Sequence, residues 1–246
     1  MVKDNNQYRR TTAYLHMQPL LAEPVPEIAG LMWGFAGVVA LRDALERLSV
    51  EQLAAMAGAL RHRGSDDAGV YRDERAGFNH ARLSVIHLTT GQQPLSNEEG
   101  TLWITFNGEI FNYVEPREEL VGLSHRFRTR TDTEVVVHDC EAWGEKAFDR
   151  FNGQRAAALW NSRERTLVLA RDSFGVRPLL VCEHAGRIDF ASEVKAIFAA
   201  SSAIPRALCE RKSRQGSRSV RSYPRTAWTR SASDVSRRNR ALATEI

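Results

Sequence analysis

The sequence predicts one domain of the α+β class, built from antiparallel sheet with helices packed against it. Short strand-like segments follow one another along the chain, and helical segments are grouped between them. A chain of 246 residues with 43% hydrophobic content can bury one sizeable core. No internal repeat is evident.

The first elements begin at Gly34. An apolar strand is predicted over 34–39, and Ser49 with Gln52 three residues later resembles a capping box that opens a helix to about Leu60. The polar run 61–67 predicts a loop. Further strands are expected at 68–72, 76–80 and 101–106, and the last of these is expected to end in a turn at Asn107-Gly108-Glu109.

The second half alternates in the same way. Helices are predicted at 114–121 and 133–143, the second capped by Thr131 or Asp132. Four strands with short turns follow, and Ser192-Glu193 opens a final helix to about Ala199. These strands are expected at 155–160, 166–170, 179–183 and 187–191.

Both ends differ from the centre. Residues 1–31 show no sustained period, and Pro24 and Pro26 would stop a helix, which predicts a flexible leader. From Cys209 the chain is dense in Ser and Arg and poor in aliphatic residues, which predicts disorder. The expected division is therefore a leader at 1–31, a folded domain at 32–200 and a basic tail at 201–246.

The basic charge lies in that tail. Residues 209–246 carry a net charge of +7, whereas the remaining residues sum to −3, although the whole chain is +4. The tail offers only Tyr223 and Trp228 for stacking on bases, so nucleic-acid binding is disfavoured.

The three cysteines form no metal-binding spacing, so no metal site is expected. A reducing cytoplasm is the simplest home for them. No run approaches the roughly 18 apolar residues that a membrane span needs, and no secretory signal is recognisable.

A few polar residues could hold an amino-acid amide. Arg82 could grip a carboxylate, and the Asn107 side chain and the Gly108 N–H could converge on one oxygen. Glu109 and Asp132 could pair with an ammonium group. Taken singly, each has an ordinary alternative, because an Arg at a strand end is usually a surface charge and Asn-Gly is usually a turn.

The order in which these residues occur is more specific. The sequence resembles the N-terminal class II glutamine amidotransferase domain of bacterial asparagine synthetases over about 170 residues. The resemblance rests on Met32-Trp33-Gly34-Phe35-Ala36-Gly37, Arg61-His62-Arg63-Gly64, His80-Ala81-Arg82-Leu83-Ser84, Gln93-Pro94-Leu95, Phe106-Asn107-Gly108-Glu109-Ile110-Phe111-Asn112, Thr131-Asp132-Thr133-Glu134, Arg171-Asp172 with Gly175 and Pro178-Leu179, and Ala191-Ser192-Glu193 with Lys195-Ala196.

The resemblance implies a four-layer αββα sandwich of the N-terminal-nucleophile hydrolase type. In that family an N-terminal Cys attacks glutamine, and its freed α-amine serves as the base. By resemblance, Asn107 and Gly108 match the oxyanion hole, and glutamine is the expected ligand. The matching glutamine-binding positions are Arg82, Val85, Ile86, Glu109 and Asp132. Family members often dimerise, so a homodimer is among the expectations.

The sequence departs from the family at the nucleophile. Trp33 stands at the position of the Cys, and its indole has one N–H donor and no nucleophilic atom. Thirty-one residues precede Met32, so position 33 has no free α-amine in the chain as written. Cys140 and Cys182 fall in a predicted helix and strand, where packed core residues are expected.

A second departure lies at Gln154 and Arg155, where the family has an apolar strand. Either this strand is an edge that tolerates polar side chains, or a buried Arg reduces stability. Ser65, at a position where the family usually has Pro, is a smaller change.

The third departure follows Ala200, where no Ser-Gly-Gly-x-Asp-type motif of a synthetase domain occurs. ATP and Mg²⁺ would belong to that domain, so no cofactor is expected here. The abrupt change of composition suggests a frameshift near Cys209, which reading the gene in its other two frames would test.

These observations predict a glutaminase-domain homologue of asparagine synthetase that does not hydrolyse glutamine. A non-catalytic glutamine-binding or protein-interaction module is the alternative.

Overall fold

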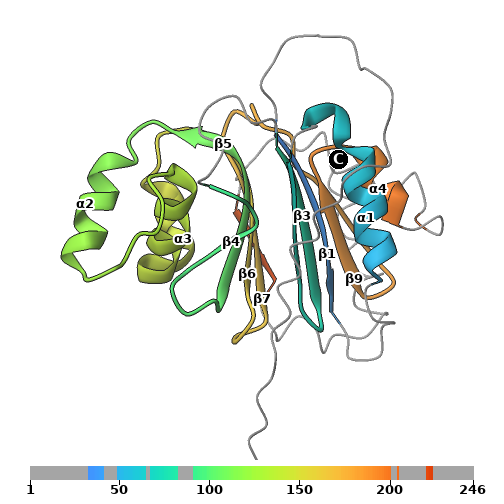
Figure 1. Cartoon of the computed structure of the whole chain (residues 1–246), viewed down its shortest axis with the longest axis horizontal. Helices are drawn as coiled ribbons and strands as arrows, with labels where there is room; N and C mark the ends of the chain where they lie inside the picture. The colour runs from blue at the N-terminus through green and yellow to red at the C-terminus, as the bar shows by residue number, and fades with distance from the viewer. Residues whose placement is uncertain are drawn as a thin grey trace, which may run out of the picture.

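Two stacked antiparallel sheets lie between two layers of helices (Figure 1). The computed structural model describes residues 33–41, 49–64, 67–82, 91–200, 204 and 220–223. The observed layers confirm the predicted α+β class and the four-layer αββα sandwich.

Each sheet has five strands, and all the pairings are antiparallel. The first sheet has the order β2-β3-β1-β9-β8 and is formed by β1 (Gly34–Ala40), β2 (Asp67–Arg72), β3 (Ala76–Arg82), β8 (Leu180–His184) and β9 (Arg187–Ala191). The second has the order β10-β7-β6-β5-β4 and is formed by β4 (Leu95–Ser96), β5 (Leu102–Ile110), β6 (Gly153–Asn161), β7 (Thr166–Arg171) and β10 (Val220–Tyr223).

The helices cover the two outer faces. The first sheet is covered by α1 (Val50–Ala59) and α4 (Val194–Ala200), and the second by α2 (Val114–Gly122) and α3 (Asp132–Trp143) (Figure 1). Two short 3₁₀ helices, η1 (Arg61–Arg63) and η2 (Gly144–Asp149), follow α1 and α3.

The period of two along the central strands produces the layers. In β1, Phe35 and Val39 enter the core between the sheets, whereas Ala36 and Val38 pack beneath α1 and α4. Strand β6 divides in the same way, because Trp160 faces the other sheet and Leu159 faces the layer of α2 and α3. Both faces of these strands are therefore buried, which explains their nearly continuous apolar sequences.

The predicted helix starts are confirmed by the caps. The Ser49 hydroxyl accepts from the Gln52 N–H at 3.1 Å, and the Gln52 side chain accepts in return from the Ser49 N–H. At α3 the cap is Thr131, whose hydroxyl accepts from the Glu134 N–H.

The expected turn at Asn107-Gly108-Glu109 is wrong, because β5 continues through these residues to Ile110. Pairing with β6 overrides the turn preference of the Asn-Gly pair, and the register runs on from Asn107↔Ala156 to Ile110↔Gly153. A Cβ on Gly108 would lie 2.1 Å from the Gln154 carbonyl oxygen, so glycine permits this close pairing.

The edge position considered for Gln154 and Arg155 is also wrong, since β6 lies between β5 and β7. The Arg155 side chain is buried, but it is not unpaired. Its guanidinium donates to the carbonyl oxygens of Phe148 at 2.5 Å and Phe151 at 3.2 Å. The buried charge is therefore accommodated by the chain that leaves η2.

The strand β10 falls within the tail that was expected to be disordered. Its residues Val220–Tyr223 pair with Leu167–Ala170 of β7, so the expectation does not hold for these four residues. Their sequence, with a β-branched residue and an aromatic one, suits a strand added to the open side of β7. Ile204, also in the tail, is buried in the core beneath α1 and α4. The leader and the remaining residues of the tail lie outside the described residues.

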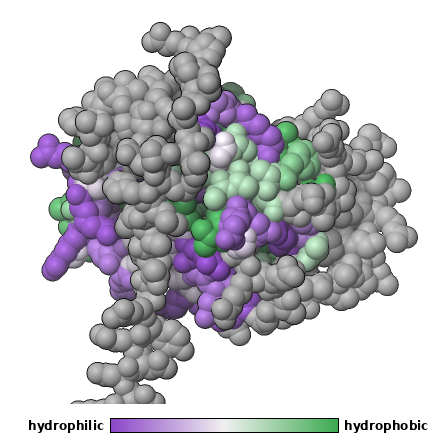
Figure 2. Space-filling model, turned by 45° about the vertical axis from the view of Figure 1, so that its right-hand side comes forward, coloured by the Kyte–Doolittle hydropathy of each residue, from purple (hydrophilic) through white to green (hydrophobic). Residues whose placement is uncertain are grey.

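Figure 2, turned to bring the side of α1 and α4 forward, shows moderately apolar residues beside strongly hydrophilic ones. Among the described helices, none is long and apolar enough to cross a bilayer.

Candidate active site

The site predicted from sequence is assembled at one end of the sandwich. It combines the start of β1, the end of β3, the last part of β5 and the first turn of α3. Strands β1 and β3 are antiparallel with Gly34 opposite Ala81, so the next position along places the Trp33 backbone beside that of Arg82. Residues 49 positions apart in sequence thereby meet at one edge.

Trp33 is linked to the other sheet through His80. The two rings are in edge-to-face contact with centroids 5.9 Å apart. The buried His80 ring lies with its Nε2 3.2 Å from the Phe106 carbonyl oxygen in β5. The His80 ring therefore lies between the Trp33 indole and β5, the strand that carries the candidate oxyanion hole.

Gln93 holds the same part of β5 from the other side, and sequence reasoning gave it no role. Its side-chain oxygen accepts from the Phe106 N–H at 2.6 Å, and its amide nitrogen donates to the Thr133 hydroxyl at 3.4 Å. Because β4 begins only at Leu95, opposite Ile104, the edge of β5 from Phe106 onward has no strand beside it, and the Gln93 side chain satisfies part of that edge. Gln93 therefore fixes both β5 and the first turn of α3.

The Gly108 N–H points along this same edge. The backbone N–H groups of Phe106 and Ile110 both bond to side chains there, Gln93 and Asp132. Alternate residues of a strand present their N–H groups to the same side, so the Gly108 N–H lies between these two bonds. This direction makes the Gly108 N–H a candidate donor to a ligand.

The Asn107 side chain faces the space between the sheets. Alternation along β5 places it on the same face as Trp103, which packs against the inter-sheet core. Asn107 is 2% exposed, and its Nδ2 has no hydrogen-bond partner among the described residues. A buried amide donor without a partner is costly in a protein interior, which favours a role in binding.

Asp132 connects the end of β5 to α3. One carboxylate oxygen accepts from the Ile110 N–H at 2.9 Å and the other from the Thr133 N–H at 2.8 Å. Burial raises the pKa of Asp132, and the nearby Glu109 carboxylate adds to the rise, although these hydrogen bonds oppose it. Glu109 itself is exposed, so the two acids form a half-open negative site suited to an ammonium group.

The structure brings together five of the eight residues predicted for the site, namely Trp33, Asn107, Gly108, Glu109 and Asp132. For Arg82 it describes the backbone at the end of β3, and the side chain lies outside the described part. Val85 and Ile86 lie outside the described residues as well.

Neither of the two described thiols lies in the predicted site. Cys140 and Cys182 are both buried, as expected for core residues. Burial strongly raises the pKa of the Cys140 thiol, which opposes formation of the reactive thiolate. Their positions in α3 and β8 place them in the outer cores rather than between the sheets.

Comparison with known proteins identifies the family. The model of the glutamine amidotransferase domain matches residues 32–223. The chain belongs to the glutamine amidotransferase family. This match confirms the resemblance found in the sequence, and it includes the strand β10 of the tail.

Relatives of this glutamine amidotransferase domain include asparagine synthetases. The chain is 40% identical over 174 residues to asparagine synthetase [glutamine-hydrolyzing] 1 of Bacillus subtilis, covering 70% of this chain and 28% of the relative. It is 37% identical over 165 residues to the probable asparagine synthetase [glutamine-hydrolyzing] of Dictyostelium discoideum, covering 65% and 30%. The chain thus spans less than a third of the length of these relatives.

Solved structures support the fold. Glutamine phosphoribosylpyrophosphate amidotransferase of B. subtilis, complexed with ADP and GMP, superposes with a TM-score of 0.56 at 20% identity, covering 68% of this chain and 43% of that one. A second structure, of an allosteric regulatory enzyme of purine biosynthesis, gives a TM-score of 0.58 at 18% identity, again covering 68% and 43%. At this identity the likeness shows the fold alone.

Proposed function

We propose that this domain retains the fold of a glutamine-hydrolysing domain of the asparagine synthetase type but does not hydrolyse glutamine. The observation that carries the proposal is Trp33 at the head of β1, where the family has its nucleophile. Hydrolysis requires an atom that attacks the side-chain carbonyl carbon of glutamine, after which ammonia leaves and water releases the bound glutamyl group. The Trp33 indole offers no such atom.

The proposal involves no cofactor, because thiol attack on an amide requires none. ATP and Mg²⁺ would serve the activation of aspartate in a synthetase domain. Glutamine is the proposed ligand, with Arg82, Val85, Ile86, Glu109 and Asp132 as its binding residues and Asn107 and Gly108 as the donors to its side-chain oxygen.

Glutamine binding without hydrolysis is a second candidate function. The unpartnered Asn107 Nδ2 favours it, because a buried donor gains a hydrogen bond when an amide oxygen enters. The half-buried Trp33 indole opposes it if it occupies space that glutamine needs, because an indole is much larger than the thiol side chain of the family. Calorimetric titration of the full chain with glutamine distinguishes the two candidates, since a relic without binding gives no heat.

The activity test measures ammonia release from glutamine by the full chain. We expect no release above a buffer blank. Release at a rate proportional to protein concentration, and unaffected by Trp33→Ala, would overturn the proposal.

A reconstructed nucleophile tests whether the rest of the pocket is intact. Trp33→Cys in a chain that starts at this position supplies both a thiol and a free α-amine, and we expect glutaminase activity to return. Adding Asn107→Ala to that variant removes one oxyanion donor and is expected to lower kcat by about 10²–10³-fold. A folded Trp33→Cys chain without activity would show that the pocket is damaged elsewhere.

A further inference from the structure

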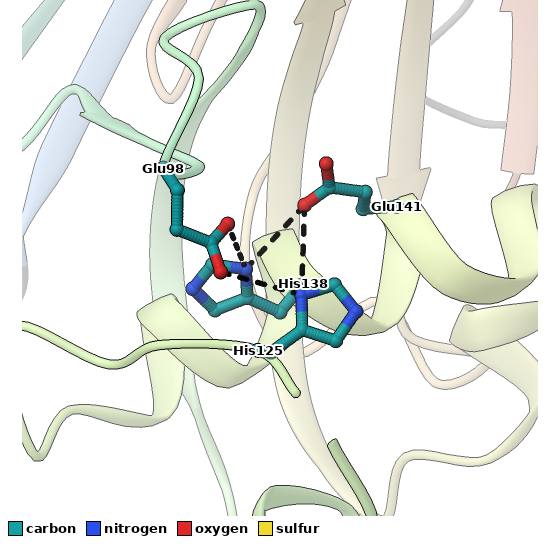
Figure 3. Close-up of side chains that lie close together, drawn as sticks. All are labelled: Glu98, His125, His138 and Glu141. Carbon is teal, nitrogen blue, oxygen red and sulfur yellow. Dashed lines mark ion pairs between the residues drawn. The ribbon is translucent and has the colours of Figure 1, made fainter. Parts of the chain in front are cut away.

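Four side chains that sequence reasoning did not connect meet on the outer side of the second sheet (Figure 3). Glu98 lies in the turn between β4 and β5, His125 follows α2, and His138 and Glu141 stand one turn apart on α3. One ligand atom from each residue lies within 4.8 Å of all the others. We propose that Glu98, His125, His138 and Glu141 form a binding site for Zn²⁺.

The spacing of the four ligand atoms fits a tetrahedral ion. Bonds of about 2.0–2.2 Å in a tetrahedron place neighbouring ligand atoms roughly 3.3–3.6 Å apart. The His138 Nδ1 lies 3.2 Å from Glu98 Oε2 and 3.5 Å from Glu141 Oε2. The His125 Nδ1 lies 3.5 Å from Glu98 Oε1 and 3.8 Å from Glu141 Oε2. The distances from His138 Nδ1 to the two carboxylates are close to the tetrahedral range, whereas His125 is nearest to the other oxygen of Glu98, so an ion would draw the ligand atoms together from a spread of up to 4.8 Å.

The His138 ring is the second observation. It is 1% exposed, and neither of its ring nitrogens makes a hydrogen bond. Its Nδ1 points toward the two carboxylates, while its Nε2 is 3.9 Å from Glu134, beyond hydrogen-bond range. Its contacts are ion pairs with carboxylates, Nδ1 with Glu98 and Glu141 and Nε2 with Glu134, and a metal ion at Nδ1 would give the buried imidazole a directed bond.

Both carboxylates are already oriented by outer hydrogen bonds. The Arg126 N–H donates to Glu98 Oε1 at 2.8 Å, and the Asn97 amide donates to Glu141 Oε1 at 2.8 Å. Each acid thereby turns its other oxygen, Oε2, toward His138. Outer partners of this kind are what hold the ligands of known metal sites in place.

The donor set favours zinc over the common hard cations. Two imidazole nitrogens suit Zn²⁺, whereas Mg²⁺ and Ca²⁺ prefer sites made of oxygen. The two carboxylates also balance the charge of a divalent ion. Bound there, the ion would join the β4–β5 turn, the segment after α2 and the helix α3.

The test is equilibrium dialysis of the full chain, stripped of metal and without an affinity tag, against Zn²⁺. We expect one zinc per chain, no comparable binding of Mg²⁺, and a melting temperature raised by about 5–10 °C at a hundredfold excess over the dissociation constant. Co²⁺ in place of Zn²⁺ should give the visible absorption of a tetrahedral ion.

Matched variants locate the ion. Glu98→Gln and His125→Gln each remove one ligand from a partly exposed position and are expected to weaken zinc binding at least ~10-fold. Glu99→Gln alters the neighbouring acid, which pairs instead with Arg163 at 3.1 Å, and His62→Gln removes a histidine elsewhere; both should bind zinc as the parent does.

Two results would overturn the proposal. The first is a folded parent chain that binds no zinc, which would leave the cluster as a set of ion pairs. The second is zinc binding that Glu98→Gln and His125→Gln leave unchanged, which would place the ion elsewhere in the chain.

Discussion

Replacement of Gly108 by Ala tests how closely β5 and β6 approach beside the candidate oxyanion hole. The added Cβ would lie 2.1 Å from the Gln154 carbonyl oxygen and 2.8 Å from the Arg155 Cα. Both atoms belong to the backbone of a central strand, so they cannot move aside as a flexible side chain would. The two strands must therefore separate.

Two effects determine how Gly108→Ala changes the free energy of unfolding. Overpacking of this kind destabilises by about 1–3 kcal/mol or more. Replacing Gly by Ala returns roughly 0.5–1 kcal/mol because the unfolded chain becomes less flexible. With contacts this short we take the upper part of the range, which leaves a net loss of about 2 kcal/mol and a melting temperature lower by about 4–8 °C.

Gly58→Ala is the matched control. Gly58 is exposed in α1, and a Cβ there meets nothing within 4 Å, so we expect a gain of about 0.5–1 kcal/mol. Urea and thermal denaturation of both variants measure the difference. If Gly108→Ala were as stable as the parent while Gly58→Ala behaved as expected, the close approach of β5 and β6 would be refuted.

Three further predictions concern stability. Gln93→Ala leaves the buried Phe106 N–H without a partner and should cost about 2–3 kcal/mol in urea denaturation, whereas Gln92→Ala at the exposed neighbour should cost far less. Arg155→Leu strips the donors from two buried carbonyl groups and should cost about 2–4 kcal/mol; an unchanged midpoint would show that they find other partners. Burial opposes ionisation of Glu193, but hydrogen bonds outweigh it and lower its pKa to about 2, so its contribution is present above about pH 4.5 and is lost as the pH falls toward 2. We expect Glu193→Gln to remove roughly 1–2 kcal/mol of that acid dependence, and a titration of stability that the substitution leaves unchanged would contradict this.

Local signals predicted the elements well where local chemistry determines them. The Ser49–Gln52 pair located the start of α1, because both halves of a capping box lie within four residues. The short apolar runs of β6 and β7 were sufficient to predict strands. Local signals could not predict the order of the strands in a sheet. For this reason an edge position was considered for Arg155, although β6 is a central strand.

Other features depend on residues far apart in the sequence. The Asn107-Gly108 pair prefers a turn locally, but pairing with β6 keeps it in a strand. The sequence did not predict the cluster of Glu98, His125, His138 and Glu141, because these residues come from three separate segments. Only the spacing of His138 and Glu141, one turn apart on a predicted helix, could have indicated it.

The described residues proposed to bind glutamine are held in place by hydrogen bonds that do not include Trp33. The candidate oxyanion donors are held by β6, Gln93 and His80, and the acid at the start of α3 is held by β5. None of these hydrogen bonds involves the Trp33 side chain, so a substitution at position 33 is expected to leave these hydrogen bonds intact. Under the proposed function, introducing a Cys at position 33 would therefore leave the hydrogen bonds of the described site residues in place. For the same reason, glutamine binding measured in the unmodified chain would reflect how much space the Trp33 indole occupies.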